Sequence, residues 1–177
     1  MSKLIPYAHA KSVYDIDIDF FSKLNLKYIF FDLDNTLDIH SCKDPSQRAV
    51  ELMKDIKSIG ITPIIISNNK ESRVKRYADQ CGVHYMYRTF KPFPWRLNKF
   101  MKRNNIKHED VVLIGDQLLT DVRCAKYVGI RCILTEKLKP TDQLITKFYR
   151  WVDEIKRSRL MKENLLVDWR TIYGSIK

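Results

Sequence analysis

Short runs of apolar residues, rich in β-branched and aromatic side chains, recur along the first three quarters of the chain. Each run is nearly continuous rather than alternating with polar residues, which is typical of strands that are covered on both faces of a sheet. The five predicted strands are Leu26–Phe31, Ile61–Ile66, Val83–Tyr87, Val111–Ile114 and Ile130–Leu134.

Amphipathic helical patterns fill the intervals between these strands. Gly60, Gly82 and Gly129 each precede a predicted strand, as is common where a residue with left-handed backbone ends a helix. Regular alternation of strands and helices predicts an α/β fold, a Rossmann-like parallel sheet with helices on both faces. The predicted helices are Ser46–Ile59, Glu71–Gln80, Pro94–Asn104 and Leu119–Tyr127.

Length and composition narrow the classes of protein to which this chain can belong. With 177 residues it has room for one domain and an appendage. No apolar run approaches the roughly 20 residues that cross a bilayer, and the first ten residues lack the long apolar stretch of a secretory signal. We therefore expect a cytoplasmic protein. Cysteine and histidine are scattered without closely spaced pairs, so a structural zinc site is not expected.

Polar residues that can carry chemistry follow four consecutive predicted strands. In parallel α/β sheets, ligands bind outside the carboxyl ends of the strands, so these residues should gather at one edge. They are Asp32 and Asp34 after the first strand, Ser67 and Asn68 after the second, Lys91 after the third, and Asp116 with Asp121 after the fourth.

This set of residue types favours phosphate chemistry. Residues i and i+2 of an extended chain point to the same side, so Asp32 and Asp34 are expected to converge. Together with Asp116 they would repel one another unless a cation joined them, and oxygen ligands select Mg²⁺. Lys91 and the Ser67 hydroxyl can hold a phosphate dianion. One aspartate can then attack phosphorus while a second moves protons.

The ordered motifs resemble those of the haloacid dehalogenase-like hydrolases. The resemblance implies that Asp32 is the nucleophile and that Asp34 is the general acid and base, with its backbone carbonyl offered to the metal. The motifs are DLDNT at Asp32–Thr36, Ser67 after an apolar strand, Lys91, and GDQLLTD at Gly115–Asp121.

The same resemblance assigns the remaining site residues. Ser67, Asn68 and Lys91 are expected to bind the phosphoryl group. Mg²⁺ is expected at Asp32, Asp34, Asp116 and Asp121, the last either as a ligand or as a support behind the ligands.

Motif spacing indicates a member of the family without a cap domain, of subclass III. The intervals from Asp34 to Ser67 and from Ser67 to Lys91 each have room for one helix and its connections. The site should therefore be open, which suits a phosphate carried by something large, such as a lipid headgroup, a protein or a nucleic acid.

The N-terminal segment and the first motif also resemble the capless YqeG-like subfamily, which is related to the phosphatidylglycerophosphate phosphatases. The likeness covers roughly residues 5–136. It implies phosphatidylglycerophosphate at a membrane surface as substrate. A soluble or macromolecular phosphoester (nucleotide, sugar or phosphoprotein) and a basic, RNA-associated binding module remain alternatives. Asp38 and Trp95 depart from the pattern and have no assigned role.

Beyond Thr135 the chain becomes strongly basic, in keeping with its net charge of +11. Leu144, Phe148, Trp151, Val152 and Ile155 recur at helical spacing, which predicts a basic amphipathic helix within residues 137–162. The helix either docks on the sheet or contacts anionic lipid on the inner face of the membrane, and nucleic acid is a third option. The expected organisation is an N-terminal extension packed on the core (1–24), a phosphatase core (25–136) and a basic helical extension (137–177).

Overall fold

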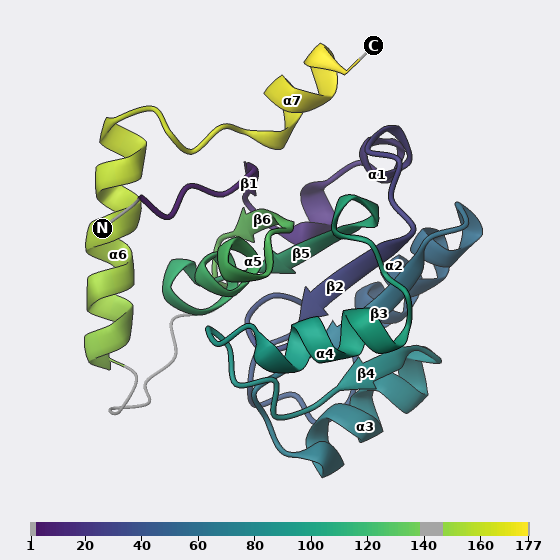
Figure 1. Ribbon diagram of the computed structural model, residues 1–177. Helices are drawn as coiled ribbons and strands as arrows, with labels where there is room; N and C mark the ends of the chain where they lie inside the picture. The colour runs from purple at the N-terminus through teal and green to yellow at the C-terminus, as the bar shows by residue number, and fades with distance from the viewer. Residues whose placement is uncertain (1–2, 139–146, 177) are drawn as a thin grey trace.

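The computed structural model describes residues 3–138 and 147–176, with the backbone alone for residues 147–150 (Figure 1). The strands are β1 (Ala8–Ala10), β2 (Tyr28–Asp32), β3 (Thr62–Ile66), β4 (His84–Met86), β5 (Val111–Gly115) and β6 (Arg131–Thr135). The α-helices are α1 (Ile18–Lys23), α2 (Gln47–Ser58), α3 (Glu71–Cys81), α4 (Trp95–Arg103), α5 (Arg123–Val128), α6 (Lys147–Lys162) and α7 (Trp169–Ser175). Short helical turns form at Val13–Asp15, His108–Asp110 and Leu118–Val122, the last being π-helical.

The six strands form one parallel sheet in the order β1-β6-β5-β2-β3-β4. Parallel neighbours need crossover connections, and the helices between the strands supply them. β2 and β5 lie side by side in the middle of the sheet, with Phe31 opposite Ile114. This register brings the ends of the two strands, and the aspartates found there, to the same place.

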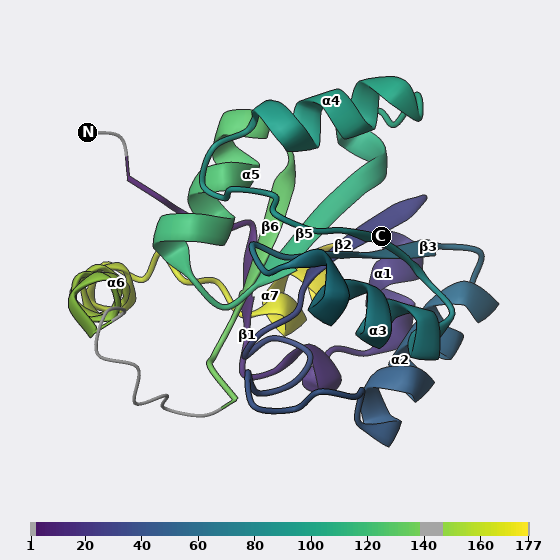
Figure 2. The same ribbon diagram turned by 90° about the horizontal axis from the view of Figure 1, so that it is seen from below.

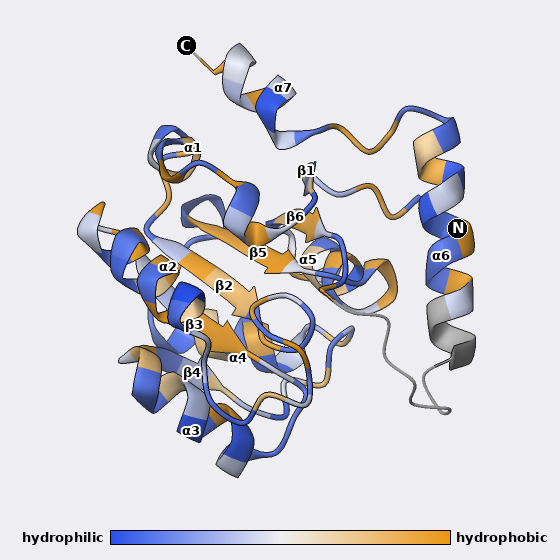
Figure 3. Ribbon diagram, turned by 180° about the vertical axis from the view of Figure 1, so that it is seen from behind, coloured by the Kyte–Doolittle hydropathy of each residue, from blue (hydrophilic) through white to orange (hydrophobic). Residues whose placement is uncertain are grey.

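Helices lie on both faces of the sheet (Figure 2), and buried apolar side chains pack between the strands and the helices on each face. Successive side chains of a strand point to opposite faces. Ile29 and Phe31 accordingly pack in the layer beneath α1, α2, α3 and α7, whereas Phe30 packs in the layer beneath α4 and α5. Figure 3 shows the central strands as the most hydrophobic part of the ribbon. The continuous apolar runs of the sequence therefore reflect burial from both sides.

The predicted α/β fold is confirmed, and each of the five predicted strands forms with small shifts of its ends. The sixth strand, β1, was not predicted. Its sequence, Ala8–Ala10, is short and lacks β-branched residues. It forms because it pairs with the edge of β6, with Ala8 opposite Ile133. The predicted helix Leu119–Tyr127 is divided, since a π-helical turn precedes α5.

The described residues contain no cap domain over the carboxyl edge of the sheet. β2 is joined to α2 by residues 33–46, and β3 is joined to α3 by residues 67–70. Of the predicted tail positions, Leu144 lies outside the described residues, and Phe148 is described by its backbone alone. None of the described helices is both long enough and apolar enough to span a bilayer. The division of the chain at residues 24 and 136 stays a prediction.

Candidate active site

Three buried carboxylates meet at the carboxyl edge of the sheet. Asp32 ends β2, Asp116 follows β5, and Asp121 lies in the π-helical turn that comes next. One carboxylate oxygen of each lies within 4.8 Å of the others. A Cβ atom on Gly115 would overlap the carboxyl group of Asp121, so only glycine allows this close approach.

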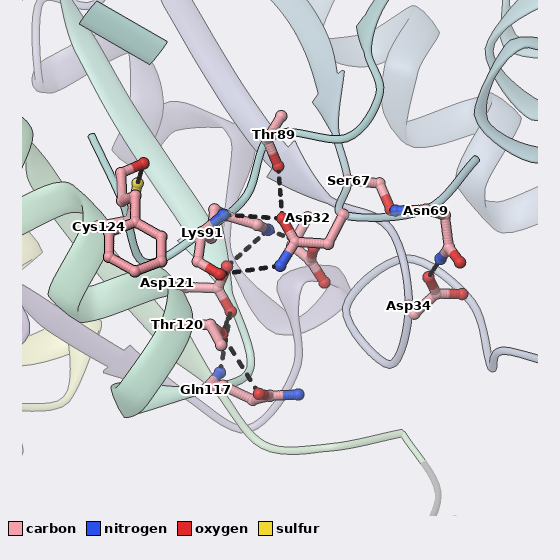
Figure 4. A network of polar contacts seen from close by, with 12 residues as sticks. Asp32, Asp34, Ser67, Asn69, Thr89, Lys91, Gln117, Thr120, Asp121 and Cys124 are labelled. Carbon is pink, nitrogen blue, oxygen red and sulfur yellow. Dashed lines mark hydrogen bonds and ion pairs between the residues drawn. The ribbon is translucent and has the colours of Figure 1, made fainter. Parts of the chain in front are cut away.

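The ammonium group of Lys91 lies against two of these carboxylates, those of Asp32 and Asp121, and the residue is only 6% exposed (Figure 4). Its Nζ is 2.5 Å from Oδ1 of Asp32 and 2.7 Å from Oδ1 of Asp121. Asn68 holds the backbone of this lysine through its side-chain amide. Its Oδ1 accepts from Lys91 N at 2.8 Å and from Thr89 Oγ1 at 2.9 Å. Its Nδ2 also donates to the Lys91 carbonyl at 2.9 Å, so the Asn68 side chain holds the lysine segment.

Burial shifts the pKa values of these groups strongly. It raises the pKa of Asp32 to about 7, with the positive charge of Lys91 opposing the rise and the negative charge of Asp121 adding to it. It also raises the pKa of Asp116 well above its usual range, and Asp32 and Asp121 add to that rise. For Lys91, burial alone would lower the pKa, but the facing carboxylates raise it. One ammonium group thus faces three carboxylates, which leaves an excess of negative charge.

The carboxylates fit a divalent cation. Both carboxylate oxygens of Asp116 are buried and accept no hydrogen bond from any residue that the structure describes. A buried carboxylate without partners is costly, and a cation would supply the missing interaction. The donors are all oxygen atoms, which are the ligands that Mg²⁺ prefers. Asp32, Asp116 and Asp121 are therefore placed to hold a metal.

Ser67 lies at the same edge, directly after β3, and is buried. Its backbone is fixed on both sides, because its N–H donates to the Met86 carbonyl at 2.9 Å and its carbonyl accepts from Thr89 N at 3.0 Å. Its Oγ accepts from Asn69 N at 3.1 Å, and the hydroxyl hydrogen is left for another acceptor. Phosphate binding by Ser67 stays a prediction.

The side chain of Asp34 does not converge with that of Asp32. Its carboxylate accepts hydrogen bonds from Arg73 Nη2 at 2.5 Å and from Asn69 Nδ2, and His40 Nδ1 lies 3.2 Å away. Figure 4 shows it apart from the cluster around Lys91. The expected convergence assumed an extended chain, but β2 ends at Asp32, so the alternation of the strand does not continue to Asp34. The proton-transfer role of Asp34 stays a prediction.

Two comparisons with known proteins decide the family. A profile of haloacid dehalogenase-like hydrolases matches residues 38–129, about half of the chain. The probable phosphatase YqeG of Bacillus subtilis (strain 168) is 34% identical over 159 residues, which cover 90% of this chain and 92% of that protein. The chain belongs to the haloacid dehalogenase-like hydrolases. The predicted family is thereby confirmed, and the likeness to YqeG supports a phosphomonoester hydrolase.

Solved structures agree with the fold of this haloacid dehalogenase-like hydrolase. A Vibrio cholerae protein assigned as a 3-deoxy-D-manno-octulosonate 8-phosphate phosphatase matches with a TM-score of 0.54 and 16% identity, over 73% of this chain and 78% of its own. A protein of Xanthomonas campestris, solved as a hypothetical protein, matches with a TM-score of 0.52 and 17% identity, over 73% of this chain and 74% of its own. At such identities these structures show the fold alone.

A helix outside the predicted core of this haloacid dehalogenase-like hydrolase also reaches the site. Arg157 of α6 is 7% exposed. Its Nη2 donates to the carbonyl oxygens of Asp116 and, at 3.0 Å, of Thr135. Asp153, one turn earlier, accepts from Arg157 Nε at 3.2 Å and from Leu119 N at 2.9 Å. The sequence prediction missed this pair because both residues resemble the solvated charges of a basic helix. Their i, i+4 spacing could have indicated that they pair with each other.

The two residues without an assigned role lie in different settings. Asp38 is buried, and its Oδ2 accepts from Tyr77 Oη at 2.6 Å and from Ser46 N at 2.9 Å. It therefore joins the start of α2 to α3 and does not enter the carboxylate cluster. Trp95 is exposed and stacks on Phe90 with ring centroids 5.5 Å apart. This aromatic pair lies beside the segment that carries Lys91.

Proposed function

We propose that the chain is a Mg²⁺-dependent phosphatase that acts through an aspartyl-phosphate on Asp32. The observation that carries the proposal is the pairing of buried Asp32 with Lys91, next to a carboxylate of Asp116 that has no partner among the described residues. Such a site brings a nucleophile, a fixed positive charge for phosphoryl oxygens and a cation site to one place.

The chemistry balances with the residues at hand. An oxygen of Asp32 forms a bond to phosphorus while the bond from phosphorus to the leaving oxygen breaks, and Asp34 protonates the leaving alkoxide. Asp34 turns from Arg73 toward the cluster to do so. It then takes a proton from the water that hydrolyses the aspartyl-phosphate, which restores Asp32. Lys91 and Ser67 hold the phosphoryl oxygens throughout.

Mg²⁺ at Asp32, the Asp34 carbonyl and Asp116 would neutralise charge on the phosphoryl oxygens. Asp121 is then best suited to a supporting role, because it already accepts from Lys91 and, at 3.2 Å, from the backbone N–H of Gln117. A residue in such a supporting position orients the groups that bind the metal.

We further propose phosphatidylglycerophosphate as the substrate, hydrolysed at a membrane surface. Three features support it: the open edge of the sheet, the exposed aromatic side chains Phe93 and Trp95 beside the Lys91 segment, and the likeness to YqeG. A lipid headgroup presents its phosphate from a surface, and a capless site can reach it without closing around the whole molecule.

Phosphate release tests both parts of the proposal. The purified chain would be given phosphatidylglycerophosphate in mixed vesicles, a sugar phosphate, a nucleotide, a phosphopeptide and p-nitrophenyl phosphate, each with Mg²⁺ and with EDTA. We expect release that needs Mg²⁺ and is fastest from the lipid. Asp32→Asn should remove it, whereas Asp55→Asn, the same change at an exposed position on α2, should not.

The different substrates test the phosphatase activity and the lipid substrate separately. Turnover of soluble phosphoesters without turnover of the lipid would reject the substrate and keep the phosphatase. Unchanged turnover in Asp32→Asn would reject the mechanism. If no arm turned over and RNA bound with a steep salt dependence, a basic binding module would replace the phosphatase.

A further inference from the structure

A pocket of about 610 Å³ lies between α5, α6 and the N-terminal segment, and its lining includes none of the clustered carboxylates. The first residue of the π-helical turn, Leu118, forms part of its wall, and Leu160 of α6 forms another part. Its remaining lining consists mostly of cations and includes one carboxylate: Lys3, Leu4, Arg123, Lys126, Tyr127, Lys156, Arg159 and Glu163.

The single carboxylate of this pocket is already paired. Lys3 Nζ lies 2.7 Å from Oε2 of Glu163. Lys126 Nζ donates to the backbone carbonyl of Lys3 at 2.8 Å. Arg123, Lys156 and Arg159 add three positive charges that the Lys3–Glu163 pair does not offset, so the pocket is positive.

Three of the cations have no counter-charge among the described residues. The side chains of Arg123, Lys156 and Arg159 form no hydrogen bond or ion pair with any residue in ranges 3–138 and 151–176. Arg123 and Lys156 are moreover only partly exposed, so water screens them incompletely. These three cations line one pocket and repel one another. A phosphate group would relieve that repulsion by accepting charge-assisted hydrogen bonds from them.

Apolar and aromatic side chains stand beside the cations. Tyr127 lines the pocket and is 59% exposed, and on α6 Trp151 is 59% and Ile155 41% exposed. Trp151, Ile155 and Arg159 follow at four-residue spacing, so they lie along one side of the helix. Figure 3 shows hydrophobic and hydrophilic residues mixed along α6. Exposed Trp and Tyr among Lys and Arg are typical of helices that lie in the interface of a membrane.

We propose that this pocket binds the phosphate groups of anionic phospholipids, so that α6 lies against the headgroups of a bilayer. An RNA backbone would also satisfy the cations, but it would leave the aliphatic Ile155 without an apolar partner. Lys156 of the pocket precedes Arg157, whose guanidinium contacts the Asp116 carbonyl, so docking would place the edge of the active site beside the membrane. That orientation rests on the proposed function; the lipid binding itself does not.

Vesicle flotation tests the binding. The full chain would be mixed with vesicles of phosphatidylcholine alone or with added phosphatidylglycerol, in EDTA, so that no turnover contributes. We expect binding to the anionic vesicles alone, weakening as salt rises. Lys156→Glu/Arg159→Glu should reduce it at least tenfold, since each basic residue near the surface contributes appreciably to binding. The control Lys54→Glu/Lys102→Glu changes net charge equally at exposed positions on α2 and α4 and should bind like the wild type.

Hydrolysis of p-nitrophenyl phosphate separates this inference from the proposed function. Both double variants should keep the wild-type rate on this soluble compound, whereas the pocket variant should lose turnover of vesicle-borne lipid. Equal binding by the two variants, equal binding to neutral and anionic vesicles, or binding to RNA but not to vesicles at the same salt would overturn the lipid pocket. Flotation remains decisive even if the chain hydrolyses none of the substrates offered.

Discussion

Arg157 is one of the side chains that attach α6 to the edge of the sheet, and Arg157→Met removes its contacts while keeping a side chain of similar length. In the wild type the guanidinium satisfies the buried carbonyl oxygens of Asp116 and Thr135 and pairs with buried Asp153. Methionine supplies neither the charge nor the donors. The variant therefore leaves a buried carboxylate and two carbonyl oxygens without their partner.

The magnitude follows from these losses. Removing one member of a buried ion pair costs about 3–5 kcal/mol because the other charge stays buried. The carbonyl oxygens would each add about 1–3 kcal/mol, although part of this is recovered when water enters. We expect Arg157→Met to lower the free energy of unfolding by about 3–5 kcal/mol. With a denaturant slope near ~2 kcal/mol per molar urea, the midpoint falls by about 2 M.

Urea unfolding followed by circular dichroism measures this change. Arg159→Met is the matched control, because it makes the same substitution two positions along α6 at an exposed side chain. Its effect should stay within about 0.5 kcal/mol. Arg157→Lys keeps the charge but loses the fork geometry, and it remains usable if the methionine variant does not fold.

The lysine variant also reports on the metal site. Because Arg157 contacts the carbonyl of Asp116, we expect Arg157→Lys to raise the Mg²⁺ concentration needed for half-maximal thermal stabilisation by about tenfold. A methionine variant within about 1 kcal/mol of the Arg159→Met control would refute the energetic reasoning. An unchanged Mg²⁺ requirement in Arg157→Lys would refute the link to the metal site.

Three further predictions follow from the buried charges. Asp116→Asn should stabilise the metal-free protein, because burial raises the pKa of Asp116 and so disfavours its charged form, and it should abolish stabilisation by Mg²⁺. Thermal unfolding with and without the ion checks both. Since the pKa of Asp32 is raised to about 7, the folded state binds more protons than the unfolded state between about pH 4 and about pH 7, so metal-free stability should fall as pH rises through that window. Urea midpoints across the window check the sign, and a rise would contradict it. Tyr77→Phe should lower the free energy of unfolding by about 1–3 kcal/mol, because it removes a hydrogen-bond donor from buried Asp38. Stabilisation by Mg²⁺ should not change, and a change in it would place Asp38 in the metal site.

Much of the site's framework could be predicted because it depends on strand order and on where strands end. The apolar runs predicted where β2 and β5 lie in the sequence, and residues at the ends of neighbouring parallel strands must lie close together. Asp32 and Asp116 therefore lie in one cluster. Lys91 could be placed at the same edge for the same reason. β1 could not be predicted, because its three residues owe their extended form to the edge of β6.

Side-chain directions depended on partners far away in the sequence. The carboxylate of Asp34 is held by Arg73, which lies on a helix beyond the next strand, and no local pattern reports that contact. Arg157 and Asp153 were hidden for a similar reason. In a helix with many solvated charges, only the packing of α6 against the sheet distinguishes the two buried residues from the rest.

The central claim is that Asp32 becomes phosphorylated during turnover, and chemical trapping tests it most directly. The enzyme would be mixed with p-nitrophenyl phosphate and Mg²⁺, quenched in acid, and reduced with borohydride, which converts an aspartyl-phosphate to homoserine. Peptide mass spectrometry should find homoserine at position 32 in the wild type and none in Asp32→Asn. Steady hydrolysis by the wild type with unmodified aspartate at position 32, or with homoserine at another position, would contradict the account.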